Sequence, residues 1–457
     1  MPSERTTYRK RIAGKLKDKK IVWVGSRSCD AIPLTEFKNN IVSICYGSPA
    51  LHEAIKEHTY EEMMEHRVNP YTYDQTQDTS EGGRELRRLL IKELEEPSFV
   101  IPYRPMEMVD TAFFLHHEKT KMLGLFSEFQ HPFNHKTWLE TTLQNDGMRT
   151  IPWQYRQFNE AAKQEIYREV VEHPVMLRVN ASAAGPGIVR IDSRHDFEAA
   201  WNWMTNHNAK LIAFSRYFSG ASPICASATV YEDGRVALHP LSLQCIGVPE
   251  LTPINSGYSG NDFGVTKDFP PHAFNQLEAM IRHTGQWLSS KGYLGSFGLD
   301  ALFHNDEMYY IETNPRFMVS SKLTASIDAA LDRPDVYMTH IASFLGLPPP
   351  PQIPLVELNA LQPQMGQMIF HNTHPHLVKV QKRESHYNDL PFSVIQTPEP
   401  TVSVDPGSPI STLYWNEPLL LPNGHLNETG QFIAATFLQS ITLRPQGLHL
   451  GVEDEAP

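Results

Sequence analysis

The sequence predicts an α/β fold built from several structural units. The chain has 457 residues, which is enough for roughly three units of about 150 residues each. Strand-like apolar runs alternate with charged, helix-like runs over the first part of the chain, which is the pattern that α/β units produce. After residue 134 the pattern changes, and residues 292–313 contain two apolar stretches separated by a turn signal.

Composition and charge exclude several classes of protein. Hydrophobic residues make up 40% of the chain, which is enough for a sizeable core. The formal net charge of −12 argues against general nucleic-acid binding, which needs a basic surface. No stretch approaches the ~20 apolar residues of a membrane-spanning helix. We therefore expect neither a nucleic acid nor a membrane as a partner.

The cysteines and residues 1–20 indicate the cellular compartment in which the protein is expected. The four cysteines include no CxxC pair, so we expect free thiols in a reducing compartment; they are Cys29, Cys45, Cys225 and Cys245. Residues 1–20 contain eight Lys or Arg and two acidic residues, and no apolar stretch follows them. No secretory signal is therefore expected, and the predicted location is cytoplasmic. We predict a solvated basic arm for residues 1–20, with contact to an anionic partner as the alternative.

Residues 21–133 are predicted to form an N-terminal α/β domain. Residues 21–25 and 41–46 are apolar runs typical of buried strands. Residues 51–67 and 84–96 have helical spacing and many charges.

A second group of elements is predicted between residues 134 and 346. The predicted strands cover 175–179, 188–191, 211–214, 224–231 and 236–244, and the predicted helices cover 135–145, 158–173, 272–290 and 321–345. Residues 255–264 are predicted to be a polar, Gly-rich loop, either over an acceptor site or simply exposed. A Pro-rich linker, 347–354, is the predicted boundary before a C-terminal segment, 355–457, of unknown role.

The segment 295–316 contains the most informative pattern. Two apolar strands flank Asn305-Asp306-Glu307, which is a turn signal. If the hairpin is centred on Asp306, Asp300 lies directly opposite Glu312, and the two Cβ atoms are about 5 Å apart. Asn314 lies two residues beyond Glu312 and therefore on the same face of its strand.

Two like charges placed opposite each other destabilise a hairpin unless something compensates them. A hard divalent cation such as Mg²⁺, which prefers oxygen ligands, is the natural compensation. The alternative is a solvent-facing hairpin with incidental acidic residues. The apolar neighbours of Asp300 and Glu312 argue against that alternative, because they indicate burial.

This hairpin resembles the metal-binding end of the ATP-grasp superfamily, the carboxylate–amine ligases and their relatives. The family has an acidic residue on one strand and Glu-x-Asn-x-Arg on the next, which Asp300 and Glu312-Thr-Asn-Pro-Arg316 match. The resemblance implies that Asp300, Glu312 and Asn314 bind Mg²⁺, with two ions as the usual number and Mn²⁺ as the alternative metal. It also implies a catalytic Arg316 that stabilises the transferred phosphoryl group or the acyl phosphate.

The resemblance also implies an ATP-grasp architecture. Residues 21–133 would form the pre-ATP-grasp domain, 134–218 a mobile lid subdomain, and 219–346 a catalytic subdomain with a central antiparallel sheet. The Pro-rich linker and the C-terminal segment would be additions to this plan.

The resemblance extends to an ATP site. Arg178 stands where the family usually has a phosphate-binding Lys, and it is assigned a catalytic role as well. The small residues that follow it leave room for backbone N–H groups to approach phosphate oxygens. Ser215 replaces the acidic residue that commonly precedes the adenine-reading backbone. The residues implied in ATP binding are Lys136, Arg178, Ser182, Ala184, Gly185, Gly187, Arg216, Tyr217 and Phe218.

The implied function is an ATP-dependent ligase, nearest to peptide or amino-acid ligases of bacterial specialised metabolism. It would join a carboxylate, from an amino acid or a peptide, to an amine through an acyl phosphate, and it would release ADP and phosphate. Two alternatives stay open: a carboxylase-type member that uses bicarbonate, and a nucleotide-binding module that has lost turnover. The expected partners are a small-molecule carboxylate and an amine, and a homodimer is left open.

Overall fold

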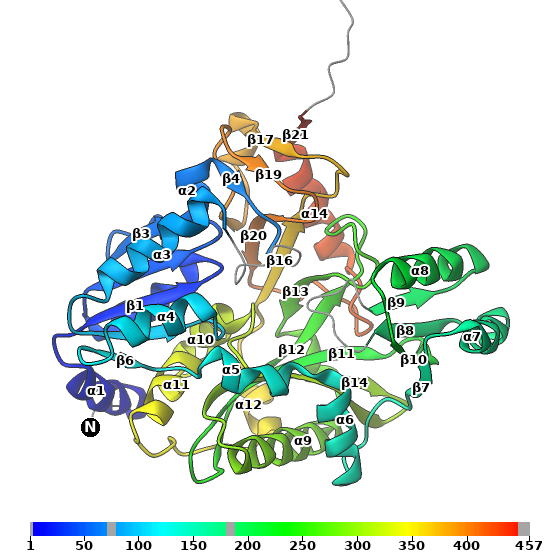
Figure 1. The fold of residues 1–457 in the computed structure, drawn as a ribbon, viewed down its shortest axis with the longest axis horizontal. Coiled ribbons are helices and arrows are strands. Elements are labelled where there is room, and N and C mark those ends of the chain that lie inside the picture. Colours follow the sequence, from blue (N-terminus) through cyan, green and yellow to red (C-terminus); the bar gives the residue numbers. More distant parts are fainter. Residues whose placement is uncertain (1–2, 71–78, 180–187, 447–457) are drawn as a thin grey trace, which may run out of the picture.

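The computed structural model describes residues 3–70, 79–179 and 188–446 of the chain. Four residues predicted to contact ATP lie outside the described residues: Ser182, Ala184, Gly185 and Gly187. The described residues form a parallel sheet and three further sheets, surrounded by helices (Figure 1). This arrangement confirms the predicted α/β fold.

The N-terminal sheet has five parallel strands in the order β3-β2-β1-β5-β6. Its strands are β1 (Lys20–Gly25), β2 (Ile41–Cys45), β3 (Ile55–Thr59), β5 (Ser98–Pro102) and β6 (Thr120–Met122). Along β1, Ile21 and Trp23 pack on one face while Val22 and Val24 pack on the other. Because both faces are covered, β1 and β2 read as continuous apolar runs.

Helices cover both faces of this sheet. One face packs against α3 (Glu81–Glu93) and α4 (Glu107–Leu115). The other packs against the 3₁₀ helix Ser28–Phe37, α1 (Glu4–Leu16) and α11 (Val336–Phe344). The helix α11 comes from a distant part of the chain, so the sheet is joined to the rest of the molecule through this face.

The prediction of a solvated basic arm for residues 1–20 is wrong. Residues of that stretch form α1, which begins after the Ser3 cap and buries Tyr8, Ile12 and Leu16. Their spacing of four residues puts the three side chains on one face of the helix. The basic residues occupy the rest of the helix surface. Arg5 also forms ion pairs, 2.6 Å from Glu36 and 3.0 Å from Asp335.

The helix predicted over residues 51–67 is also wrong in its first half. That stretch forms the edge strand β3, a short helix α2 (Tyr60–Met64) and the two-residue strand β4 (His66–Arg67). Only the ends of β3, Ile55 and Thr59, are buried, and its middle faces partly to solvent. An edge strand tolerates such charged residues, which is why the composition resembled that of a helix.

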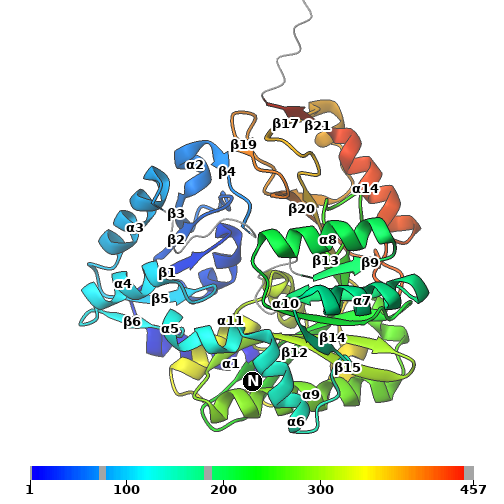
Figure 2. The same cartoon turned by 45° about the vertical axis from the view of Figure 1, so that its right-hand side comes forward.

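Within the predicted lid subdomain, 134–218, the name lid is kept below for residues 154–216. The described part of the lid contains four antiparallel strands in the order β7-β10-β8-β9. The strands are β7 (Gln154–Gln157), β8 (Val175–Val179), β9 (Ile188–Ile191) and β10 (Leu211–Arg216). Two helices, α7 (Glu160–Glu172) and α8 (Arg194–Asn206), lie beside these strands (Figure 2). They supply Ile166, Phe197 and Trp201 to a separate small core. The helix α6 (Lys136–Asn145) precedes the lid and contacts β15.

The central sheet has eight antiparallel strands in the order β15-β14-β11-β12-β13-β16-β20-β18. The first five are β15 (Glu307–Asn314), β14 (Gly295–His304), β11 (Ser222–Val230), β12 (Val236–Ile246) and β13 (Tyr258–Asp262). One face is covered by α9 (Pro271–Ser290) and α12 (Leu355–Leu361), and this contact forms the largest core. The other face carries α10 (Ser321–Ala330) and α11.

The prediction of a loop over residues 255–264 is wrong, because residues 258–262 of this stretch form the strand β13. Its polar side chains are buried inside the sheet and bond to one another, as Asn261 Nδ2 does to Ser242 Oγ at 2.9 Å. The Asp262 carboxylate accepts backbone N–H groups of Gly264, Leu419 and Leu420. A strand rich in polar residues resembles a loop in sequence because its hydrogen-bonding partners lie on other strands.

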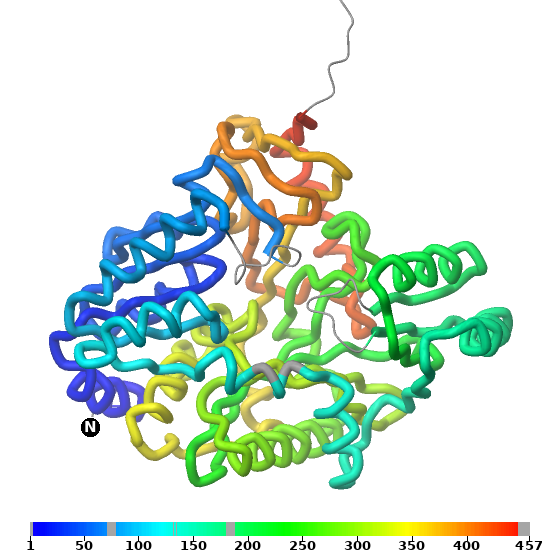
Figure 3. The backbone as a smooth tube through the Cα atoms, in the orientation of Figure 1, coloured from blue at the N-terminus to red at the C-terminus, as the bar shows by residue number. Residues whose placement is uncertain are grey.

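The C-terminal segment continues the central sheet. Strands β16 (Gly366–His371), β20 (Pro409–Trp415) and β18 (Ser393–Ile395) extend it beyond β13. The Pro-rich residues 347–354 therefore connect parts of one sheet. A four-stranded sheet joins β17 (Val378–Lys382), β19 (Ser403–Val404) and β21 (Ile441–Pro445) to β4 of the N-terminal domain. Figure 3 shows the segment that contains β4, in blue, beside the C-terminal segment, in orange.

The longest described helix of the C-terminal segment, α14 (Glu428–Ser440), packs on the central core through Ile433, Ala434 and Phe437. Within the described ranges, no helix is both long and apolar enough to cross a membrane.

Candidate active site

Two carboxylates face each other at one edge of the central sheet. Asp300 on β14 pairs directly with Glu312 on β15, as the sequence predicts. The neighbours of Asp300 along its strand, Leu299 and Ala301, belong to the core beneath the sheet. Because side chains alternate along a strand, Asp300 points to the opposite face, which carries the predicted site.

The hairpin reaches this pairing by a different route from the predicted one. Its turn is the two-residue loop Asn305–Asp306, in which both residues have positive φ angles of 50° and 61°. This conformation is typical of a tight hairpin, and it centres the hairpin between the two residues rather than on Asp306. Ala301 pairs with Tyr310 and Asp300 pairs with Glu312, so Ile311 is an extra residue that forms a bulge on β15. This bulge restores the predicted pairing of Asp300 with Glu312.

The bulge at Ile311 also determines which face of the sheet Tyr310 and Glu312 occupy. Tyr310 packs in the core and bonds to Thr313 at 2.9 Å, whereas Glu312 faces Asp300. The bulge therefore lets Tyr310 and Glu312, which are two positions apart, face opposite sides of the sheet.

Amide side chains connect the two carboxylates. Asn314 Nδ2 donates to Asp300 Oδ2 at 3.0 Å and to Glu312 Oε1 at 3.3 Å. Gln244 of β12 donates to the other oxygen of Asp300 at 3.1 Å. Burial, followed by the charge of Glu312, raises the pKa of Asp300 to about 7.

Lys136 lies beside the carboxylate pair. It is the first residue of α6, and its Nζ is 2.5 Å from Glu312 Oε2. Burial opposes ionisation of Glu312, but the adjacent Lys136 charge outweighs it and lowers the pKa of Glu312. The sequence assigned Lys136 to the nucleotide and Glu312 to a metal, and the structure brings these two residues into one ion pair.

Arg316 lies on the other side of Asn314. Its Nη2 donates to Asn314 Oδ1 at 3.1 Å, and its Nη1 donates to the Phe317 carbonyl at 3.0 Å and to the Tyr103 hydroxyl at 3.3 Å. Tyr103 follows β5 in the N-terminal domain. The guanidinium is thus held between the hairpin and the end of the parallel sheet.

The donor set fits a hard divalent cation. Two opposed carboxylates and a side-chain amide supply oxygen ligands of the kind that Mg²⁺ prefers, with substrate phosphates as the usual remaining ligands. Asn314 directs its nitrogen to the carboxylates, so a ligand role requires its amide to turn and release the oxygen from Arg316. Among the residues that the structure describes, no three His, Cys, Asp or Glu gather into a metal-binding group.

Arg178 occupies an enclosed site in the lid. Its side chain is 2% exposed, its Nη2 forms an ion pair with Glu140, and the same nitrogen lies 2.8 Å from the Tyr155 hydroxyl. The guanidinium also lies over the Trp153 ring, 4.2 Å from its centroid. Burial raises the pKa of Glu140, and the charge of Arg178 opposes that rise. Sequence reasoning missed Glu140, Tyr155 and Trp153, because Glu140 lies on α6 and the two aromatic residues lie at or just before the start of β7, away from Arg178 on β8.

The predicted adenine-reading segment lies where β10 ends. The Tyr217 N–H already donates to the Pro174 carbonyl at 2.9 Å. Phe218 stacks on His304 of the β14–β15 hairpin, with ring centroids 4.8 Å apart. The Arg216 side chain is exposed and lies 3.8 Å from Glu169. These contacts place the segment at the junction of the lid and the central sheet.

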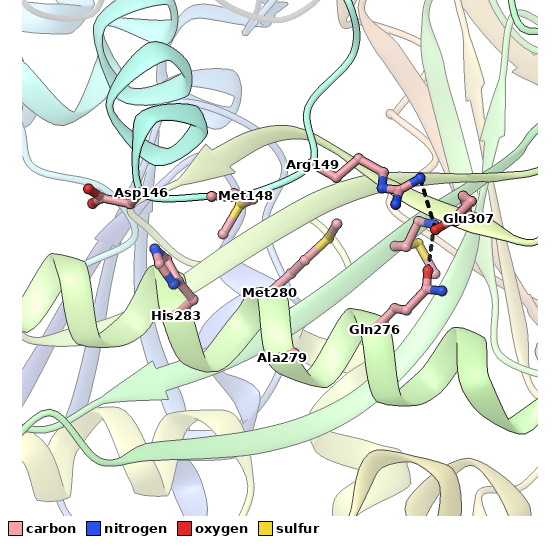
Figure 4. Close-up of a pocket in the computed structure, with 10 residues that line it drawn as sticks. Asp146, Met148, Arg149, Gln276, Ala279, Met280, His283 and Glu307 are labelled. Carbon is pink, nitrogen blue, oxygen red and sulfur yellow. Dashed lines mark hydrogen bonds and ion pairs between the residues drawn. The ribbon is translucent and has the colours of Figure 1, made fainter.

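A surface depression of about 330 Å³ lies away from the carboxylate pair (Figure 4). It is formed by the loop after α6, by α9 and by the start of β15, and its floor includes Met148, Met280 and Met308. Arg149 and Glu307 form an ion pair of 3.0 Å at its edge. It lies on the α9 side of the sheet, opposite to the face that carries Asp300.

Comparisons with known proteins support the fold through structure alone. No protein-family model matches the chain, and no curated protein matches its sequence. One similar structure is the biotin carboxylase domain dimer of Hydrogenobacter thermophilus 2-oxoglutarate carboxylase, in complex with MgADP, ADP and bicarbonate. It has a TM-score of 0.59 and 14% identity over 88% of this chain and 87% of that one.

Two further structures share the fold. Phosphoribosylamine–glycine ligase from Thermotoga maritima has a TM-score of 0.58 and 12% identity, over 93% of this chain and 97% of that one. N5-carboxyaminoimidazole synthetase from Staphylococcus aureus, complexed with ADP, has a TM-score of 0.55 and 13% identity, over 92% of this chain and 97% of that one. The chain therefore has the ATP-grasp fold, as its hairpin motif predicts.

Proposed function

We propose that the protein is an ATP-dependent ligase that joins a carboxylate to an amine through an acyl phosphate. The observation that carries the proposal is the opposed pair Asp300–Glu312, with Lys136 and Arg316 beside it, in an ATP-grasp fold. Buried like charges are costly unless they are compensated, and a bound cation supplies that compensation. MgADP and ADP in the structurally similar proteins support a magnesium nucleotide as the ligand.

Each residue of the site has a role in this proposal. Asp300, Glu312 and Asn314 would hold Mg²⁺, which neutralises phosphate charge when bound. Lys136 would leave Glu312 and contact a nucleotide phosphate. Arg316 would stabilise charge on the phosphoryl group during transfer. Catalysis of this kind depends mainly on positioning and charge stabilisation. The number of ions and the use of Mn²⁺ stay predictions.

The proposed reaction has two steps. A carboxylate oxygen of the substrate attacks the γ-phosphorus of ATP, and ADP leaves. The amine nitrogen then attacks the acyl carbon, the phosphate leaves, and an amide forms. An amino acid or a peptide is the proposed source of the carboxylate. A homodimer also stays a prediction, supported by the dimer of one structurally similar protein.

The products of ATP cleavage test this proposal. Incubation of the purified protein with MgATP and a panel of amino acids and peptides should release ADP and phosphate, and no AMP. Hydroxylamine in place of the amine should trap the acyl phosphate as a hydroxamate. Arg316→Ala should suppress this trapping, whereas Arg235→Ala, at an exposed Arg–Asp pair on another loop, should not. AMP formation would reject the mechanism, and nucleotide binding without any cleavage would favour a silent module.

A carboxylase-type reaction is the second candidate. The observation that favours it is that structurally similar proteins include a biotin carboxylase domain with bound bicarbonate and a carboxyaminoimidazole synthetase. The same assay distinguishes the two candidates. ADP release that depends on bicarbonate and on no organic acid would support the carboxylase.

A further inference from the structure

The helix α6 carries two charged residues that reach different parts of the molecule. Lys136 at its first position forms the ion pair with Glu312 of β15. Glu140, one turn further along, forms the ion pair with Arg178 of β8. Residues four positions apart lie on the same face of a helix. One face of α6 is therefore bound to the carboxylate pair at one point and to the lid at the next.

The pair of Glu140 and Arg178 is enclosed. The two side chains are 3% and 2% exposed, so neither charge is screened by solvent. The Tyr155 hydroxyl lies 3.1 Å from Glu140 Oε2 and 2.8 Å from Arg178 Nη2, which makes a closed three-membered network. In such surroundings, removing one charge leaves the other buried and unpaired.

The lid sheet fixes where this network lies. Tyr155 of β7 and Arg178 of β8 both pair with Ala213 of β10, so they flank it in one cross-strand row. Directly opposed residues share a face of the sheet. Glu140 approaches this row from α6, which does not belong to the lid sheet. The carboxylate therefore joins the lid to the helix that carries Lys136.

The surroundings of position 178 suit an arginine. The guanidinium plane lies over Trp153 at 4.2 Å while the same group reaches Glu140 and Tyr155. A planar guanidinium can stack and donate several hydrogen bonds in a fixed geometry, whereas an ammonium group acts as a point charge. The departure from the family's usual Lys thus coincides with a carboxylate and an aromatic ring placed for Arg.

We propose that Glu140 is a positioning residue, which orients Arg178 for a nucleotide phosphate and holds the lid against α6. This inference rests on the proposed function, because it needs a nucleotide at the site. Glu140 itself touches neither the nucleotide nor the reacting atoms. Its effect is transmitted through Arg178, and its loss weakens binding of ground state and transition state alike.

Equilibrium dialysis with MgADP tests the proposal without turnover. Glu140→Gln keeps the side-chain volume and removes the charge, and it should weaken MgADP binding about tenfold. The matched control is Glu165→Gln, which breaks the exposed lid pair between Glu165 and Arg156 and should leave binding unchanged. With a turnover assay, the KM for ATP should rise by about the same factor while kcat changes less than about threefold.

Two further variants separate positioning from general damage to the fold. Arg178→Met should lose binding at least as strongly as Glu140→Gln, and adding Glu140→Gln to it should cause no further loss. Arg178→Lys should also weaken binding, because Lys cannot stack and bond in the same geometry. Wild-type affinity in Glu140→Gln, or equal losses in Glu140→Gln and Glu165→Gln, would overturn this inference alone. A wild-type protein that binds no nucleotide would overturn the proposed function, and this inference with it.

Discussion

Asp300 and Glu312 lie opposite each other but differ in their affinity for protons. Burial and the neighbouring carboxylate raise the pKa of Asp300 to about 7, whereas Lys136, against the effect of burial, lowers the pKa of Glu312. Near neutral pH one carboxyl is therefore partly protonated while the other is charged. Because ligation of a cation needs both groups ionised, we expect metal binding to release a proton.

Single substitutions at this pair test the metal-ligand roles. Asp300→Asn and Glu312→Gln should each lower Mg²⁺-dependent ATP turnover by about 10²-fold or more, because each removes a charge with little change in volume. Circular dichroism should show an unchanged fold. Asp306→Asn, which removes an 85% exposed carboxylate from the turn of the same hairpin, is the matched control and should keep normal turnover. Near-normal turnover in both site variants would contradict the assignment.

The sequence could predict some residues of the site because they are close together along the chain. Asp300, Glu312 and Asn314 lie on one hairpin, so strand periodicity alone places them together. The partners of Arg178 could not be predicted, since Glu140 and Tyr155 reach it from other elements. Contacts between separate elements depend on packing, which a local pattern does not contain.

Whole elements were predictable where one face is apolar and the pairing is local. The hairpin of β14 and β15 is such a case, although its bulge at Ile311 was not predictable. The strands β1 and β2 were predictable for another reason, since burial on both faces makes each a continuous apolar run. The strand β13 was missed because its buried side chains are polar and satisfy one another across strands. In α1 the signal was present, since Tyr8, Ile12 and Leu16 repeat every four residues, but the many basic residues concealed it.

The docking of α1 on the N-terminal core can be tested by truncating a side chain of its apolar face. Ile12 is fully buried against the N-terminal core, so Ile12→Ala should lower the free energy of unfolding by about 2–5 kcal/mol. Lys10→Ala, at an exposed position of the same helix, should change it by less than about 0.5 kcal/mol. Urea unfolding of the full chain gives both values. Equal, small effects would show that α1 is not docked in solution.

At the scale of the whole molecule, the C-terminal segment ties the N-terminal domain to the central sheet. It supplies three strands to the eight-stranded sheet and pairs β19 with β4 in parallel. The pairing of β19 with β4 joins residues as far apart in sequence as Arg67 and Val404. Such long-range pairing leaves no local sequence signal, because the partners of a short strand are determined only when the chain has folded.

Arg67 is one of the residues that make this connection. Its Nε and Nη2 bind the Glu61 carboxylate, and its Nη1 donates to the backbone carbonyls of Gln396, Pro409 and Ile410. Both charged side chains are 5% exposed. One guanidinium therefore satisfies a buried carboxylate of the N-terminal domain and three carbonyl groups of the C-terminal segment at the same time.

Loss of Arg67 should destabilise the whole chain far more than loss of a surface arginine. Arg67→Met should lower the free energy of unfolding by about 3–5 kcal/mol, because it leaves the Glu61 carboxylate buried and unpaired. Arg88→Met removes a comparable pair with Glu85, but both partners are exposed and screened by solvent, so it should leave the free energy of unfolding nearly unchanged. The double variant Glu61→Gln/Arg67→Met should recover part of the loss, since no charge is then stranded. Urea unfolding measures all three variants, and a cost for Arg67→Met as small as that for Arg88→Met would show that the two parts of the molecule are not joined through this residue.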